Sequence, residues 1–251
     1  MKQLDKKVAI ITGAGSGIGR ETALLFAKEG AKVTVSDINE EAGKKVVQEI
    51  KDLGGEAIFV KANTASADDN KRVVEETVKA FGGLHISVNN AGVGNDFVKV
   101  ADLPEKDWQR VIDINLNGVF YGMKYQIPEM IKSKGGSVIN IASILGQVGF
   151  QGSSAYIASK HGVVGLTKAG AIDHAPDNVR VNAVGPGFIY TGLVNEDTMG
   201  KEAIQELEKK HALNRLGEGK EVAAMILFLA SDASSFVTGA YYPVDGGYLA
   251  L

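Results

Sequence analysis

Short apolar runs alternate with longer amphipathic stretches along the whole chain, and this alternation restricts the possible folds more than any other feature. Most of the runs are rich in valine, isoleucine and alanine, as strands covered on both faces of a sheet are. The expected strands are Val8–Ile11, Ala31–Val35, Ala57–Val60, Leu84–Val88, Ser137–Ile141, Val179–Val184 and Ala240–Val244. Between them, apolar residues recur at helical spacing, most clearly within residues 40–53 and 67–81.

Strands that alternate with helices in this way predict an α/β fold with one parallel sheet and helices on both faces. Right-handed crossovers make such a sheet doubly wound and place ligands at the carboxyl ends of its strands. Since 251 residues are compatible with one continuous core, we expect a single domain over residues 1–251. Residues 189–215 depart from the alternation, and we expect this polar, helical insertion to act as a substrate flap.

The composition excludes several classes of partner and chemistry. A net charge of −3 gives no attraction to nucleic acid or to anionic membranes. No apolar run reaches the ~20 residues that a membrane span needs. The chain has no cysteine, and its dispersed histidines lack metal-ligand spacing, so we expect no metal. The absence of cysteine fits the cytoplasm, where we expect the protein to be located.

A glycine-rich turn directly follows the first expected strand. It reads Thr12-Gly13-Ala14-Gly15-Ser16-Gly17-Ile18-Gly19, and a helical run comes next. Such a turn lets backbone approach a pyrophosphate, and the helix N-terminus attracts the anion. Asp37, at the end of the second strand, stands where a carboxylate accepts hydrogen bonds from a ribose and repels a 2′-phosphate. We therefore expect NAD. Arg20 leaves some use of NADP open, and an ordinary tight turn is the alternative interpretation.

Tyr156 and Lys160 lie four residues apart in a helix expected over residues 154–173, so they share one face. A phenol with a pKa of about 10 is a poor base at neutral pH. Because a neighbouring ammonium favours the phenolate, we expect Lys160 to lower the pKa of Tyr156. Taken alone, a pair at this spacing is more often a surface pair than a catalytic one.

In their order and spacing, the motifs resemble those of the short-chain dehydrogenase/reductase family, in its branch of NAD(P)-dependent oxidoreductases of about this length. The resemblance covers nearly the whole chain. The glycine turn matches the family's TGxxxGxG motif, and Asn89-Asn90-Ala91-Gly92 matches its NNAG signature. Pro186-Gly187, with Thr191 just beyond, matches the segment that clasps the nicotinamide carboxamide. The family's catalytic tetrad falls on Asn115, Ser143, Tyr156 and Lys160.

The resemblance implies a Rossmann fold and a role for each member of the tetrad. Tyr156 exchanges a proton with the substrate oxygen, Ser143 hydrogen-bonds that oxygen, Lys160 binds the nicotinamide ribose, and Asn115 holds a water between Lys160 and solvent. The implied cofactor contacts are Gly13, Ser16, Gly17, Ile18, Gly19, Asp37, Asn63, Thr64, Asn90, Ala91, Gly92, Tyr156, Lys160, Pro186, Gly187 and Thr191. Asn63 stands where the family usually has an aspartate; its amide oxygen can still accept a bond from adenine, without charge.

Position in the family also implies the substrate contacts, which are Ser143, Leu145, Phe150, Tyr156, Phe188 and Leu193. Their mostly apolar character favours a secondary alcohol or ketone of apolar or cyclic character, although the hydrophobic ones could equally be core residues. Two alternatives remain open: reduction of a 3-oxoacyl thioester, and a non-catalytic dinucleotide sensor or scaffold. The apolar segment after Gly246-Gly247 would be a liability in water, so we expect a homotetramer interface to cover it.

Overall fold

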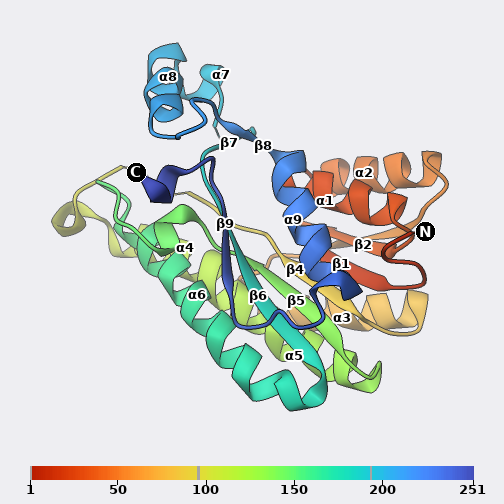
Figure 1. Ribbon diagram of the computed structural model, residues 1–251. Coiled ribbons are helices and arrows are strands. Elements are labelled where there is room, and N and C mark those ends of the chain that lie inside the picture. Colours follow the sequence, from red (N-terminus) through yellow and green to blue (C-terminus); the bar gives the residue numbers. More distant parts are fainter. Residues whose placement is uncertain (1, 95–96, 193) are drawn as a thin grey trace.

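The computed structural model describes residues 2–94, 97–192 and 194–251 (Figure 1). Its main sheet has seven strands in the order β3-β2-β1-β4-β5-β6-β9, and all neighbouring pairs are parallel. The strands are β1 (Val8–Thr12), β2 (Lys32–Asp37), β3 (Glu56–Lys61), β4 (Ile86–Asn89), β5 (Gly136–Ile141), β6 (Val179–Pro186) and β9 (Tyr241–Val244). Each expected strand is therefore confirmed, with small shifts at its ends.

Helices cover both faces of this sheet, which confirms the doubly wound α/β fold (Figure 1). One face packs against α1 (Gly17–Lys28), α2 (Glu40–Asp52) and α9 (Gly219–Ala230). The other packs against α3 (Ala67–Phe81), α5 (Gly118–Lys132) and α6 (Ser154–His174), and α4 (Glu105–Ile112) contacts α6. Each face has its own buried core, with side chains such as Phe26 and Ile50 on the first and Met130 and Val163 on the second.

The strand order reverses between β1 and β4, and this reversal positions the functional site. β1 pairs with β2 on one side and with β4 on the other, so the loops after β1 and β4 diverge to opposite faces. In a parallel sheet this reversal opens a crevice at the carboxyl ends of the strands. The glycine turn follows β1 and the NNAG segment begins at the end of β4, so the fold brings both motifs to the same crevice.

The outer segment, residues 189–215, stands apart from the body of the molecule, as the positions of α7 and α8 show (Figure 1). It contains β7 (Ile189–Tyr190), α7 (Glu196–Met199) and α8 (Lys201–Lys209), and β7 pairs with β8 (Gly217–Glu218) in a second sheet that the sequence did not predict. Ile204, Leu207 and Leu216 form a small core of their own. The expected helical insertion is therefore present, and its action as a flap stays a prediction.

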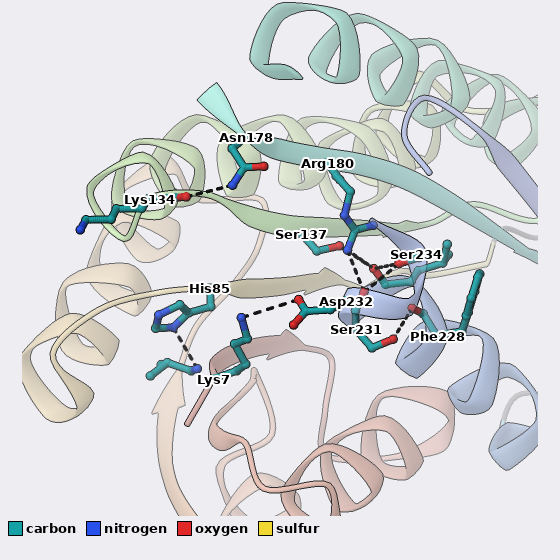
Figure 2. A network of polar contacts seen from close by, with 12 residues as sticks. Lys7, His85, Lys134, Ser137, Asn178, Arg180, Phe228, Ser231, Asp232 and Ser234 are labelled. Atoms are coloured by element: carbon teal, nitrogen blue, oxygen red, sulfur yellow. Dashed lines mark hydrogen bonds and ion pairs between the residues drawn. The ribbon is translucent and has the colours of Figure 1, made fainter. Parts of the chain in front are cut away.

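Arg180, near the start of β6, connects the end of α9 to the amino-terminal ends of the sheet's strands (Figure 2). Its guanidinium donates to three backbone carbonyls at and beyond the end of α9: those of Leu229 at 2.8 Å, Ser231 at 3.2 Å and Val237 at 3.3 Å. Ser137 also donates to Leu229 O, at 2.8 Å. A cation at the carboxyl end of a helix satisfies carbonyls that have no partner within the helix and complements the helix dipole.

We expect Arg180→Met to lower the free energy of unfolding by about 2 kcal/mol, because it leaves partly buried carbonyls without a charged donor. Arg72→Met is the matched control. Arg72 also donates to a carbonyl, that of Lys61, but its side chain is 46% exposed, so water can replace it. The control should change stability by less than about 0.5 kcal/mol. Urea denaturation measures both variants, and equal losses would contradict the assignment of this network.

Candidate active site

The glycine turn leaves the start of α1 open to an anion. Gly13 and Gly17 adopt left-handed backbone with φ of 61° and 52°, which favours glycine. A Cβ on Gly19 would lie 2.3 Å from Gly13 O, so only glycine fits there. Ser16 precedes the helix and its side chain makes no capping bond, so the first N–H groups of α1 have no side-chain acceptor. This donor set fits a phosphate.

The carboxylate of Asp37 is held against the same turn. Oδ2 accepts from the backbone N–H of Gly15 at 2.8 Å, and Oδ1 accepts from that of Asn39 at 2.8 Å. Arg20, the basic side chain beside the turn, pairs with Glu21 at 2.7 Å and with Glu49 at 2.5 Å. The guanidinium is therefore already neutralised by two carboxylates, while Asp37 is oriented beside the glycines.

The NNAG segment is fastened to the glycine turn by its own side chain. Nδ2 of Asn90 donates to Thr12 O at 2.9 Å and to Gly13 O at 3.1 Å. In return, Oγ1 of Thr12 accepts from the N–H groups of Asn90 and Ala91 at 3.0 and 3.1 Å. Asn90 thus holds the loop after β4 against the loop after β1. Thr191 also comes close to the turn, with its Cγ2 3.6 Å from the position of a Cβ on Gly17.

Asn63 and Thr64 follow β3 at the same edge of the sheet. Oδ1 of Asn63 accepts from the N–H of Ala65 at 3.1 Å, and the backbone N–H of Asn63 donates to Asp69 at 2.8 Å. Thr64 packs against Gly118, where a Cβ would lie 3.0 Å from Thr64 O. The amide oxygen of Asn63 therefore has one lone pair in use, and the contact with adenine stays a prediction.

The four residues of the expected tetrad lie together. Tyr156 and Lys160 share a face of α6, and Ser143, which follows β5, is close enough to the Tyr156 phenol to lower its pKa. Nζ of Lys160 donates to Ile141 O at 2.8 Å and lies 5.5 Å from the centre of the Tyr156 ring. A Cβ on Gly92 would be 3.3 Å from Oδ1 of Asn115 and 3.6 Å from Nζ of Lys160. The NNAG segment thus borders the same group.

The electrostatics of this group differ from our expectation. Burial raises the pKa of the Tyr156 phenol, and the hydrogen bond with Ser143 only partly opposes this effect. Burial also lowers the pKa of Lys160 to about 8. The expected net lowering of the phenol pKa is not found, because desolvation of the phenol is the largest influence on it. The phenol therefore favours the protonated form, which can donate to a carbonyl oxygen.

Asn115 lies in a π-helical segment, Asp113–Asn117, between α4 and α5. π-Helical turns occur often at functional sites. Its fully buried amide clamps the loop after β4: Oδ1 accepts from Val93 N–H at 2.8 Å, and Nδ2 donates to Val93 O at 2.9 Å. Nδ2 also reaches Ser159 Oγ at 3.3 Å. The side chain is thus a positioning element, and the implied water stays a prediction.

Aromatic side chains gather on the substrate side of the site. Phe150 lies 6.0 Å from Phe188 and 6.0 Å from Phe97, and Phe188 lies 5.9 Å from Tyr248. The sequence did not reveal Phe97 or Tyr248, because they come from distant segments and share no spacing with the others. Tyr248 packs against Phe188 and His211 of its own chain and is half-buried, and whether a subunit interface covers this segment stays a prediction. Its neighbour Leu251 remains 80% exposed.

The remaining predicted substrate contacts have different outcomes. Leu145 is only 7% exposed and follows Ser143, whose Oγ accepts from the N–H of Leu145 at 3.1 Å. Leu193 lies outside the described residues. Pro186 and Gly187, which were predicted as cofactor contacts, lie at the end of β6 and just after it, and Gly187 N–H donates to Val244 O at 3.0 Å.

Within the described ranges, no cluster of histidine, aspartate and glutamate could hold a metal ion, and no helix is long and apolar enough to cross a membrane.

An anion-binding helix start beside a Ser–Tyr–Lys group defines a class of enzyme, the NAD(P)-dependent oxidoreductases that act on CH–OH groups. The comparisons with known proteins agree. The family described as Enoyl-(Acyl carrier protein) reductase matches residues 13–249. The chain belongs to the short-chain dehydrogenase/reductase family, which confirms the expected family and type of enzyme.

Individual relatives match over almost their full length. The cyclohexanol dehydrogenase of Acinetobacter sp. (strain SE19) is 51% identical over 246 residues, 98% of this chain and 96% of the relative. The 3-oxoacyl-(acyl-carrier-protein) reductase FabG of Thermotoga maritima is 44% identical over 245 residues, 98% of each chain. Among solved structures, carveol dehydrogenase from Mycobacterium avium in complex with NAD has a TM-score of 0.96 and 32% identity, covering 100% of both chains.

Proposed function

We propose that this protein transfers hydride between NAD(H) and secondary alcohols or ketones of apolar or cyclic character, with Tyr156 as the proton-transfer residue. The observation that carries the proposal is the phenol of Tyr156 on α6, with Lys160 5.5 Å from its ring and the Ser143 hydroxyl acting on its pKa. Two relatives are named for cyclic alcohols, cyclohexanol and carveol, which supports this substrate class.

Each residue then has a chemical task. A bound nicotinamide supplies or accepts the hydride. The start of α1 holds the diphosphate, and Asp37 accepts from the ribose on the adenine side. Lys160 has three donors, of which Ile141 O takes one, so two remain for the other ribose. Ser143 and Tyr156 converge on the substrate oxygen, which receives the phenol proton in reduction and gives one up in oxidation.

A panel of alcohols tests this proposal. Purified protein with NAD should oxidise cyclohexanol faster than 2-propanol, as followed by NADH absorbance. The second candidate is reduction of a 3-oxoacyl thioester, favoured by the similarity to FabG and by the exposed Lys210, whose ammonium lies 4.9 Å from the Phe150 ring centre. Turnover of a 3-oxoacyl thioester with NADPH that exceeds alcohol oxidation with NAD would replace the first proposal by the second.

We expect NAD to be preferred over NADP, because Asp37 is oriented at the turn and Arg20 is engaged by Glu21 and Glu49. Asp37→Ser should reduce the ratio of kcat/KM for NADH over NADPH by about 30-fold, since it removes a charged acceptor and a repulsive charge. The exposed Asp52→Ser serves as the control and should leave the ratio unchanged. An unaltered ratio in Asp37→Ser would show that another residue selects the cofactor.

We also propose a homotetramer, located in the cytoplasm. Several large apolar side chains remain exposed. Among them, Ile172 (77%) lies on α6 and Phe120 (44%) on α5, while Phe228 (39%) lies on α9 and Phe236 (fully exposed) follows that helix. Exposed apolar residues in these two regions suit a tetramer with two kinds of interface. Light scattering at micromolar concentration should give four times the 26.5 kDa chain mass, and a monomer would contradict the assembly.

A further inference from the structure

His211 is buried, with 2% of its surface exposed, although it belongs to the outer segment. Its ring joins two elements: Nδ1 lies 2.8 Å from Leu207 O in α8, and Nε2 lies 3.3 Å from the backbone N–H of Phe188, just after β6. An amide N–H can only donate, so Nε2 accepts and Nδ1 carries the hydrogen that Leu207 O accepts. The two contacts fix both the tautomer and the orientation of the ring.

The ring is also enclosed by packing. A Cβ on Gly187 would lie 3.0 Å from Nε2, so the backbone after β6 comes directly against the imidazole. The imidazole lies 5.9 Å from the Phe188 ring, edge to face at 84°, and 5.5 Å from the Tyr248 ring. Since Phe188 and Tyr248 also contact each other, at 5.9 Å, the three rings form a closed triangle.

This triangle connects three parts of the chain behind the proposed substrate pocket. Phe188 faces Phe150 at 6.0 Å on one side and packs against the small core of the outer segment on the other. The backbone next to His211 is tied to the C-terminal turn, because Leu213 N–H donates to Gly246 O at 3.0 Å. The C-terminus lies at the same end of the molecule as α8 (Figure 1). His211 thus stands where the outer segment, the loop after β6 and the chain end meet.

We infer that His211 is a positioning residue that holds Phe188 and Tyr248 as one wall of the substrate pocket, and that it thereby sets the size of apolar ring the site accepts. The inference rests on the proposed function. The bond to Phe188 N–H fixes the backbone that carries the Phe188 ring. Without that bond the Phe188 ring is held less firmly. A substrate that contacts this ring then loses binding energy, whereas a substrate too small to reach the ring does not.

Two variants separate the two hydrogen bonds. In His211→Asn the amide replaces the ring only at Nδ1, so the bond with Leu207 O can persist and the bond with Phe188 is lost. In His211→Gln the longer side chain places its amide oxygen near the position of Nε2, so Phe188 N–H keeps an acceptor. His211→Asn should raise KM for cyclohexanol about tenfold with kcat little changed, and KM for 2-propanol by less than about twofold. His211→Gln should restore most of the loss.

His161→Asn is the matched control, because His161 makes a similar bond, to Ile157 O at 3.0 Å, on an exposed part of α6. Hydrogen exchange supplies a readout besides activity: the Phe188 amide should exchange faster in His211→Asn than in the wild type or in His211→Gln. Equal KM changes for both alcohols, or a normal Phe188 amide in His211→Asn, would overturn the inference. If the wild type oxidises neither alcohol, the proposed function fails instead, and the exchange rates still decide whether His211 holds this loop.

Discussion

Tyr156→Phe should reduce kcat by about 10³-fold or more while leaving the affinity for NADH within about threefold. The substitution removes only the hydroxyl, so the packing of α6 and the cofactor surface persist. The substrate oxygen loses its proton donor. Stopped-flow or steady-state absorbance measures turnover, and NADH fluorescence measures binding. Tyr125→Phe, a half-buried tyrosine on α5, is the matched control and should keep full activity.

This variant also separates an enzyme from a dinucleotide-sensing scaffold with the same fold. A scaffold would bind NADH equally well before and after the change and would show no turnover in either case. Normal turnover by Tyr156→Phe would show that another group transfers the proton.

The pH dependence of the reaction is a further check on Tyr156, because burial raises the pKa of the phenol. Reduction, which uses the protonated phenol, should therefore persist to more alkaline pH than an unperturbed tyrosine would allow.

The sequence predicts most of the fold because its signals are local. Runs such as Val8–Ile11 are typical of strands buried on both faces, and the glycine turn restricts what can follow β1. Lys160 falls four residues after Tyr156, so helix geometry alone places both on one face. The first helix was expected to follow the glycine turn, whereas the last residues of the turn, Gly17–Gly19, already belong to α1.

The remaining features depend on contacts between distant segments, which spacing cannot reveal. Arg20 is paired by Glu49 of α2, and His211 meets Phe188 only because the outer segment folds back on the loop after β6. The pKa of Tyr156 was predicted in the wrong direction for the same reason. The expectation considered a neighbouring charge, whereas the depth of burial, which only the packed structure determines, has the larger effect.

Replacing Lys160 should give the second large effect, because it should lower activity and raise stability. Lys160→Met removes the donors expected to hold the ribose and should reduce kcat/KM by about 10²-fold or more. It should also stabilise the fold at pH 7. Burial lowers the pKa of Lys160 from 10.5 to about 8, so an ammonium is kept desolvated in the folded chain. A shift of this size corresponds to about 3 kcal/mol. The lost bond to Ile141 O offsets about 1 kcal/mol of that gain.

The pH dependence identifies the cause of this stabilisation. Below pH 8 the lysine is charged in both folded and unfolded chains, so the wild type carries the full cost and the difference between Lys160→Met and the wild type is largest. Between pH 8 and 10.5 the folded wild type releases its proton while the unfolded chain keeps it, so wild-type stability rises and the difference shrinks. Lys168→Met, on an exposed part of α6, should show neither effect. Urea denaturation at pH 7, 8.5 and 10 measures the difference in free energy of unfolding between Lys160→Met and the wild type. If this difference does not change with pH, repacking and not the buried charge stabilises the variant.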